Sequence, residues 1–194
     1  MLRRCNRGFS LLEIAIVMTI AGLLIAGIWL VAVEAENSSR KSSLNRDVLQ
    51  IIQNTGAVFA NQAAAVGSFT SADAINAGIF PGNWVYGSVL HHPFARDRSA
   101  AASAAMVNQG NNILFSVGNA TINGGLPGDA CTDLAVKLGT AANFQNLGFV
   151  QINVATPLGT RIFRRGDAPI RPTDAATICS PQGRNRVEVL FDPT

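Results

Sequence analysis

The segment from Ile14 to Val33 is a run of twenty residues without one charged side chain, and it lies close to the start of the chain. As an α-helix with a rise of about 1.5 Å per residue, such a run is about 30 Å long, which matches the hydrocarbon core of a bilayer. The 194-residue chain is 48% hydrophobic but only 14% charged, whereas about a quarter of the residues is usually charged. We therefore expect one membrane-spanning helix followed by one modest exported domain.

Positive charge is concentrated before the apolar run, at Arg3, Arg4 and Arg7. Basic residues beside a hydrophobic span stay cytoplasmic, so we expect the N-terminus inside and the rest of the chain outside the cytoplasm. Without these three arginines, 12 basic residues balance 12 acidic ones. No nucleic-acid partner is expected, because phosphate binding needs a clustered basic surface. The nearest approach to a cluster, interpreted as a solvated loop, is Arg161, Arg164, Arg165 and Arg171.

The apolar run does not fit a cleavable secretory signal, whose apolar stretch is about 7–15 residues long and precedes a small-residue cleavage site. A plain signal-anchor helix explains the length and the arginines, but it does not explain Glu13, which lies in otherwise apolar sequence. An acidic residue at membrane depth indicates a functional site and needs a partner. Since no Lys, Arg or His occurs between Phe9 and Ser39, we expect the counter-charge from another chain or from a newly made terminus.

The sequence Gly8-Phe9-Ser10-Leu11-Leu12-Glu13, between a basic leader and an apolar helix, resembles the class III signal of type IV pilins and their relatives. The resemblance implies that a prepilin peptidase cuts after Gly8 and methylates the amine of Phe9. It also implies that Glu13 pairs with the free amine of a neighbouring copy, as an inner-membrane pilus assembly platform builds a helical homopolymer. Glu13 would then offset the burial of a cation only when another subunit arrives.

The chain has three cysteines, an odd number, so one of them would have no disulfide partner in an exported protein. Removal of part of the chain that contains one cysteine would leave an even pair. If the leader, residues 1–8, is removed, Cys5 leaves with it, and Cys131 and Cys179 remain where a disulfide persists. The alternatives are two buried free thiols, or a metal site that includes His91 and His92. Adjacent side chains point in different directions on a strand or helix, so a shared metal is disfavoured, and we expect neither metal nor cofactor.

The helical pattern continues beyond the apolar run without proline. It predicts one helix from about Phe9 to Val66, with a filament-core half over residues 9–33 and an amphipathic half over 34–66. Gly22 and Gly27 are either tolerated in the membrane helix, at about 1 kcal/mol each relative to alanine, or mark a place where the helix unwinds as the subunit leaves the bilayer. The predicted buried stripe is Leu44, Val48, Ile51, Ile52, Thr55, Val58, Phe59, Gln62 and Ala63, with Asn45, Arg46, Gln50, Gln53 and Asn61 between its members.

Residues 67–194 are predicted to form a globular head of short strands separated by Gly, Asn and Pro. The predicted strands are Trp84–Leu90, Asn112–Val117, Phe149–Val154, Arg161–Phe163 and Arg186–Phe191. A helix is expected to begin near Pro127 and to stop at Gly139. Its predicted buried face is Cys131, Leu134, Ala135 and Leu138. The segment Ala100–Ala105 fits either an Ala-rich helix or an exposed loop. The expected fold is α+β, a pilin fold with a long N-terminal helix on an antiparallel sheet and a disulfide-closed C-terminal region.

The order of elements in the second half of the chain resembles type IVb pilins, particularly the thin-pilus pilins of conjugative plasmids. The likeness is carried by Pro81–Val85, the helix with Cys131–Ala135, the strand Phe149–Val154, Cys179 and the last strand. It implies a disulfide-bonded region at the exposed edge of the head. The leader, with eight residues, is shorter than in this class, and Phe9 replaces the methionine that is common there.

The sequence thus predicts a filament subunit without enzymatic activity, held in the inner membrane before assembly and extracellular afterwards. The filament would serve adhesion, aggregation or conjugative contact. One alternative is a pseudopilin of a type II secretion system, which shares the N-terminal signal but differs in its Asp-rich calcium loop near the C-terminus. The other is a membrane-anchored periplasmic enzyme or binding protein, although the chain has no His-Glu-x-x-His, Gly-x-Ser-x-Gly or phosphate-loop motif.

Overall fold

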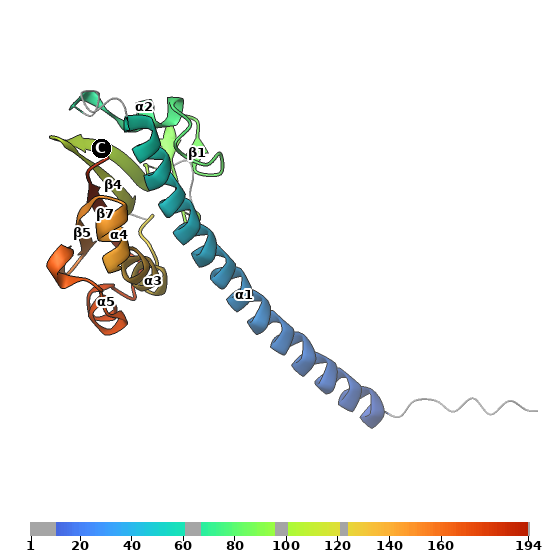
Figure 1. The fold of residues 1–194 in the computed structure, drawn as a ribbon. Coiled ribbons are helices and arrows are strands. Elements are labelled where there is room, and N and C mark those ends of the chain that lie inside the picture. Colours follow the sequence, from blue (N-terminus) through green and yellow to red (C-terminus); the bar gives the residue numbers. More distant parts are fainter. Residues whose placement is uncertain (1–10, 61–66, 96–100, 121–123, 194) are drawn as a thin grey trace, which may run out of the picture. The chain divides into compact units, whose positions relative to one another are not determined.

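The computed structural model describes residues 11–60, 67–95, 101–120 and 124–193 (Figure 1). The chain divides into two compact units, an N-terminal unit (Met1–Ser39) and a head unit (Arg40–Thr194). Helix α1 (Leu11–Phe59) contributes residues to both. It is regular through Gly22 and Gly27, as expected if these glycines are simply tolerated.

The described part of α1 ends at Phe59, earlier than the predicted end near Val66. Ala60 is a turn residue, although its N–H still donates to Gly56 O at 2.9 Å. The ring of Phe59, the last buried residue of the described helix, packs edge-to-face on Phe69, with 4.8 Å between ring centroids. Residues 9–10 and 61–66 of the predicted helix lie outside the described residues.

The head unit contains a five-stranded antiparallel sheet with the spatial order β3-β4-β7-β5-β6. Its strands are β3 (Ala104–Gln109), β4 (Asn112–Gly118), β5 (Phe149–Thr156), β6 (Gly159–Arg164) and β7 (Arg186–Phe191). The remaining elements are the hairpin β1 (Val85–Tyr86) with β2 (Val89–Leu90), the helices α2 (Ser71–Asn76), α3 (Gly128–Leu138), α4 (Ala141–Asn146) and α5 (Pro172–Ile178), and the 3-10 turn η2 (Arg165–Asp167). The expected α+β fold, with a long N-terminal helix on an antiparallel sheet and a disulfide in the C-terminal region, is confirmed.

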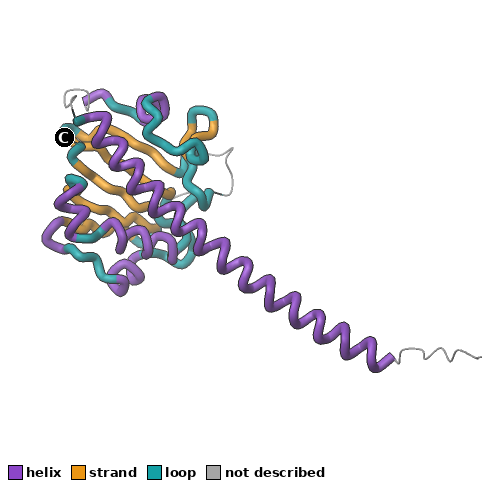
Figure 2. The backbone as a smooth tube through the Cα atoms, turned by 45° about the vertical axis from the view of Figure 1, so that its right-hand side comes forward, coloured by secondary structure: helices purple, strands orange, loops and turns teal. Residues whose placement is uncertain are grey.

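The core of the head unit lies between the sheet and the second half of α1, which crosses one face of the strands (Figure 2). Seven α1 side chains are buried: Leu44, Asn45, Val48, Ile51, Ile52, Thr55 and Phe59. Opposite them, alternate residues of the central strands are buried, among them Ile113, Phe115, Val187, Val189, Ile152 and Val154. Burial of each large aliphatic side chain stabilises the fold by about 1.5–3 kcal/mol.

The observed stripe on α1 differs from the predicted one at two positions. Asn45, expected on the polar side, is only 7% exposed, and Val58, expected inside, is 38% exposed. The reason is helical phase: Asn45 lies three residues before Val48 and seven before Ile52, on the same side of the helix as both. Gln62 and Ala63 lie outside the described residues.

Helix α3 confirms the prediction made from its flanking residues. It follows Pro127, ends before Gly139, and buries Cys131, Leu134, Ala135 and Leu138 together with Ala130. The predicted strand Trp84–Leu90 is instead the short hairpin of β1 and β2, because Gly87, with φ of +63°, reverses the chain in the middle. Trp84 itself is fully buried beside Phe80 and Phe115.

Neither prediction for Ala100–Ala105 was right for its end, since Ala104 and Ala105 begin strand β3. The two-residue turn Gly110-Asn111, with φ of +73° at Gly110, closes a hairpin that pairs all of β3 with β4. Pairing along six positions outweighs the weak helix preference of two alanines. Residue 100 lies outside the described part of the chain.

Candidate functional site

The predicted processing site and the predicted assembly residue lie on either side of the point where the described structure begins. Gly8 and Phe9, the predicted residues of leader cleavage and N-methylation, lie outside the described residues. Glu13 lies in the first turn of α1. Since the N–H groups of a first helical turn carry partial positive charge, a carboxylate is favoured there.

The first half of α1 exposes apolar side chains on every side. Leu11 is 89% exposed and Leu30 is 75% exposed, and the same holds for most large side chains from Leu12 to Val33. Its most apolar window has a mean hydropathy of 2.6, so by length and composition the helix can cross a membrane. Thr19 is compatible with such surroundings because its hydroxyl donates to Ala15 O at 2.8 Å. A helix that is apolar all round requires cover by lipid or by other protein.

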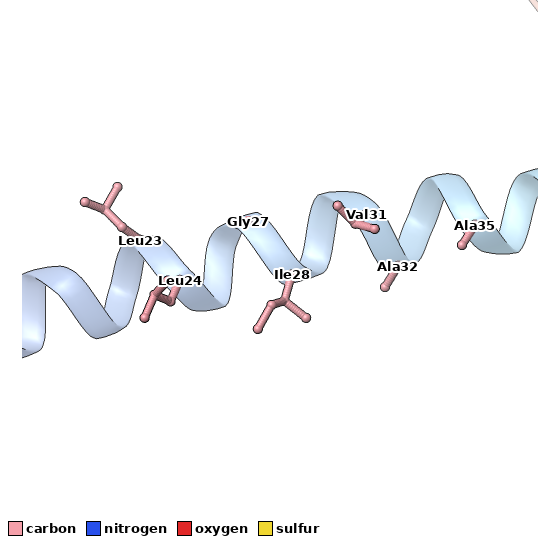
Figure 3. A pocket seen from close by; sticks show the side chains of 7 residues that line it. All are labelled: Leu23, Leu24, Gly27, Ile28, Val31, Ala32 and Ala35. Carbon is pink, nitrogen blue, oxygen red and sulfur yellow. The ribbon is translucent and has the colours of Figure 1, made fainter.

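The surface of this half is hollowed at Gly27, where a shallow apolar groove follows the helix (Figure 3). In Figure 3, Leu24, Ile28 and Ala32 project from one side of the ribbon and Leu23 from the other, and Gly27 contributes no side chain between them. Nothing lies within 4 Å of the position that a Cβ would take at Gly27. Small residues let the backbone of another helix come close, so this groove suits helix packing better than binding of a small ligand.

Comparison with known families gives one match to this segment. Residues 3–29 match the family model of the prokaryotic N-terminal methylation motif. The chain therefore carries a prepilin-type signal. The matched range includes Gly8, Phe9 and Glu13 and most of the apolar run, and it supports a precursor of the type IV pilin and pseudopilin kind. No curated protein and no solved structure matches the chain.

Among the polar contacts of the second half of α1 inside the head unit, three involve an aspartate carboxylate. Lys41 Nζ lies 2.7 Å from Asp129 Oδ2, Asn45 Nδ2 donates to Asp133 Oδ2 at 2.5 Å, and Trp84 Nε1 donates to Asp47 Oδ2 at 2.9 Å.

The contact with Lys41 is the main reason why the pKa of Asp129 lies below its ordinary value. Sequence analysis missed all three pairs, because their members are distant in the chain. Only the phase of Asn45 on the buried stripe indicated one of them.

The disulfide joins helix α3 to the end of α5. Cys131 lies on the buried face of α3, and Cys179 is the first residue after α5, with 5.9 Å between their Cα atoms. The two alternatives, free thiols and a metal site at these cysteines, are therefore excluded. Gly128 brings α3 close to the segment after Cys179, since a Cβ there would lie 2.9 Å from Ser180 O.

The adjacent histidines are both buried, and their rings have separate surroundings. His92 Nδ1 accepts from Phe94 N–H at 3.1 Å, so Nε2 carries the proton and donates to Gly124 O at 2.6 Å. Burial lowers the pKa of His92 from 6.5 to about 4. The ring of His91 meets that of Tyr86 edge-to-face. Within the described ranges, no three His, Cys, Asp or Glu side chains are grouped to hold a metal ion.

The four arginines between positions 161 and 171 are exposed, but the interpretation of their segment as a loop was wrong in part. Arg161 and Arg164 belong to the edge strand β6, Arg165 begins η2, and Arg171 precedes α5. The guanidinium carbon of Arg161 lies 5.5 Å from the ring centroid of Phe163, which is a cation–π contact at this edge of the sheet.

Proposed function

We propose that this chain is the precursor of a type IV pilus subunit, with a structural role and without enzymatic activity or cofactor. The observation that carries the proposal is the methylation motif of residues 3–29, which continues into an exposed apolar helix. Prepilin peptidase removes residues 1–8, and the subunit waits in the inner membrane with its N-terminus in the cytoplasm. The assembly platform then moves it into a surface filament of identical copies.

Glu13 would select the correct neighbour during that transfer. Cleavage after Gly8 turns Phe9 into a cationic terminus four residues before Glu13. In the membrane, a carboxylate near the helix end can stay close to the interface or take up a proton at modest cost. In a filament core both options, contact with the interface and uptake of a proton, become less favourable. The Phe9 amine of another copy then becomes the counter-charge.

The subclass that we propose is type IVb, with a filament that serves adhesion, aggregation or conjugative contact. Its support is the resemblance in the order of the head elements, together with the disulfide between α3 and the end of α5. The covalent link braces the C-terminal half of the head by joining α3 to the end of α5. A head exposed outside the cell would benefit from such a brace, because no chaperone restores it there.

The test is to express the chain with and without an active prepilin peptidase and to measure its mass after membrane extraction. We expect loss of the eight leader residues, and one methyl group on the new terminus, only with the peptidase. Gly8→Leu is the control that should keep the full mass in both strains. An intact Met1 terminus in the presence of active peptidase would favour the membrane-anchored enzyme or binding protein instead.

A pseudopilin would give the same mass, so a second measurement is needed. Filaments sheared from the cell surface should contain this chain as a major component, visible by electron microscopy with an antibody against the head. Processed protein that stays in the membrane fraction, in cells that secrete by a type II system, would support the pseudopilin and contradict the pilus subunit.

A further inference from the structure

The two edges of the five-stranded sheet differ in what their outward backbone groups bind. On β3, the register with β4 turns Met106 and Asn108 outward. Met106 N–H donates to Ser71 Oγ and Ser71 Oγ–H donates to Met106 O, both at 2.9 Å. Asn108 N–H donates to Phe69 O at 3.2 Å. Phe69 in the segment before α2 and Ser71 at the start of α2 therefore cover this edge.

The β6 edge has no such cover. Thr156 and Gly159 close the β5–β6 hairpin across a two-residue turn, so they are a hydrogen-bonded pair and the bonding alternates from there. The backbone groups of Thr160 and Ile162 therefore point away from β5. Within the described part of the chain, no strand pairs with that side of β6. Only the next outward group is occupied, because Arg164 N–H donates to Asp167 Oδ2 at 2.9 Å.

A small hollow borders the open edge. It has a volume of about 230 Å³ and lies between the hairpin tip and the end of α5, with Leu158, Thr177 and Ile178 among its lining residues. Leu158 is 88% exposed and Ile162 on the strand is 46% exposed. A strand added along β6 would gain backbone hydrogen bonds from the edge and a place for one apolar side chain in the hollow.

The charges around β6 select the kind of strand that fits. Arg161, Arg164, Arg165 and Arg171 are all exposed here. The acidic side chains of this stretch are Asp174 in α5 and Asp167, whose carboxylate is occupied by the Arg164 N–H. A second copy paired edge to edge would bring two arginine-bearing strands side by side, and repulsion between like charges is destabilising. An acidic strand would be attracted instead.

We propose that β6 is a strand-addition site for an extended acidic segment of a different protein. The added strand pairs its backbone with Thr160 and Ile162, places its carboxylates on the face of Arg164, and inserts one apolar side chain beside Leu158. The site goes beyond the filament-forming role, because it lies in the head unit and requires neither leader cleavage nor Glu13.

The test uses the full chain in micelles of a neutral detergent and a labelled nine-residue peptide in which Glu alternates with Val, Thr and one central Leu. Binding is followed by fluorescence anisotropy, and amide hydrogen exchange is followed residue by residue. We expect exchange to slow at Thr160 and Ile162, whose N–H groups the peptide would bind. The amides of Arg161 and Phe163 already bind β5 and should not change. The same peptide with N-methyl groups on alternate amides should not bind.

Matched variants separate the backbone contribution from the charge contribution. Ile162→Pro removes one outward N–H at an edge position where proline is tolerated, and we expect the dissociation constant to rise about tenfold. Ile162→Val should bind like the parent. Arg164→Glu should weaken binding at low salt, whereas Arg46→Glu, the same charge change on an exposed position of α1, should not.

Several results would overturn the proposal. One is absence of peptide binding, and another is equal binding by the parent and by Ile162→Pro. A third is protection of Thr160 and Ile162 at high protein concentration without peptide, which would identify a second copy as the occupant. A fourth is binding of a single-stranded DNA oligomer with the affinity of the peptide and no slowing at these two amides, which would indicate a general anion surface.

Discussion

The two halves of helix α1 differ in where their partners are found. From Leu11 to Val33 the side chains are apolar and exposed on every side, and the described residues of the N-terminal unit offer them no core. From Leu44 to Phe59 one stripe is buried against strands of the same chain, and polar contacts flank it. Both halves are regular helix, so helix propensity does not separate them. The difference is that the strands of the same chain bury the apolar side chains of the second half, whereas the described residues of the chain do not bury those of the first half.

It follows that changes in the two halves should have different consequences. A substitution in the apolar segment from Leu11 to Val33 should alter assembly and leave the stability of the head unit unchanged. A substitution in the second half, or in the elements that pack on it, should alter the free energy of unfolding of the head and leave membrane insertion unchanged.

The largest expected effect belongs to Glu13 in the first half. Glu13→Gln should be processed and should reach the membrane with a folded head, yet enter filaments poorly, because the Phe9 amine of a neighbour would lose its anion. Glu13→Val should be worse, since Gln can still accept a hydrogen bond. The measurement is the amount of sheared filament relative to an equal membrane pool.

Glu34→Gln is the matched control for this experiment, because it removes a carboxylate from the same helix just after the apolar run. It should assemble normally. Normal filament numbers from both Glu13 variants would contradict charge pairing and leave Glu13 as a recognition element for the peptidase only.

The second prediction concerns the disulfide of the head unit. The cysteines are 48 residues apart, and the chain-entropy model gives about 4 kcal/mol for closing such a loop. Cys179→Ser should therefore lower the free energy of unfolding of the head by about that amount, while the apolar helix still inserts. Chemical denaturation of the full chain in detergent, followed by the fluorescence of the buried Trp84, measures it.

Two further cysteine variants, Cys131→Ser and the double variant, serve as controls for this prediction. Cys131→Ser and the double variant should cost the same as Cys179→Ser, because all three remove one bond. An additive loss in the double variant, or a head whose stability does not respond to reductant, would contradict the prediction.

Much of this fold was predictable because local signals and tertiary structure agree. Short strand-like runs separated by Gly, Asn and Pro located β4, β5 and β7, and Pro127 and Gly139 located the ends of α3. Signals for other elements were present but not used. Thr70 and Asp73 form a capping box at α2, Pro172 opens α5, and Gly110-Asn111 indicates a two-residue hairpin turn before β4.

Other features could not be predicted from local sequence. The hydrogen bond from Asn45 to Asp133 joins residues that are 88 positions apart, and it exists only because α1 and α3 pack together. The open edge of β6 depends on strand order, since β7, the last strand, inserts between β4 and β5 and leaves β6 at the end of the sheet. The candidate assembly site, in contrast, could be located from local sequence, because Gly8, Phe9 and Glu13 lie in one contiguous motif.

The third prediction is an acid sensitivity of the head unit through His92. Its pKa is lowered to about 4 in the folded state from 6.5, so the unfolded state binds the proton more readily between these values. The stabilisation by neutral His92 is complete above pH 6.5 and is lost as the pH falls to about 4, by an amount of about 3 kcal/mol.

The measurement is the pH dependence of head unfolding in the parent and in His92→Gln, which cannot titrate. The parent curve should fall more steeply than the variant curve from pH 6.5 to 4, and the apolar half of α1 should not affect the difference. Parallel curves would show that His92 is not the group responsible.

The smallest expected effect tests where the second half of α1 begins. Lys41 lies just inside the head unit and forms an ion pair with Asp129, whose side chain is 59% exposed. Because an exposed pair is screened by water and salt, Lys41→Gln should lower head stability by less than about 1 kcal/mol. The pKa of Asp129 is lowered in the folded state. The stabilisation by the ion pair is therefore present when the pH is above the ordinary pKa of an aspartate, and it is lost as the pH falls through the lower pKa of the folded state.

Glu34→Gln, seven residues earlier on the same helix, should leave head stability unchanged. A double-mutant cycle with Asp129→Asn isolates the pair energy, and high salt should reduce it. If Glu34→Gln destabilised the head as much as Lys41→Gln, the division of α1 into an assembly half and a head half near residue 40 would be wrong.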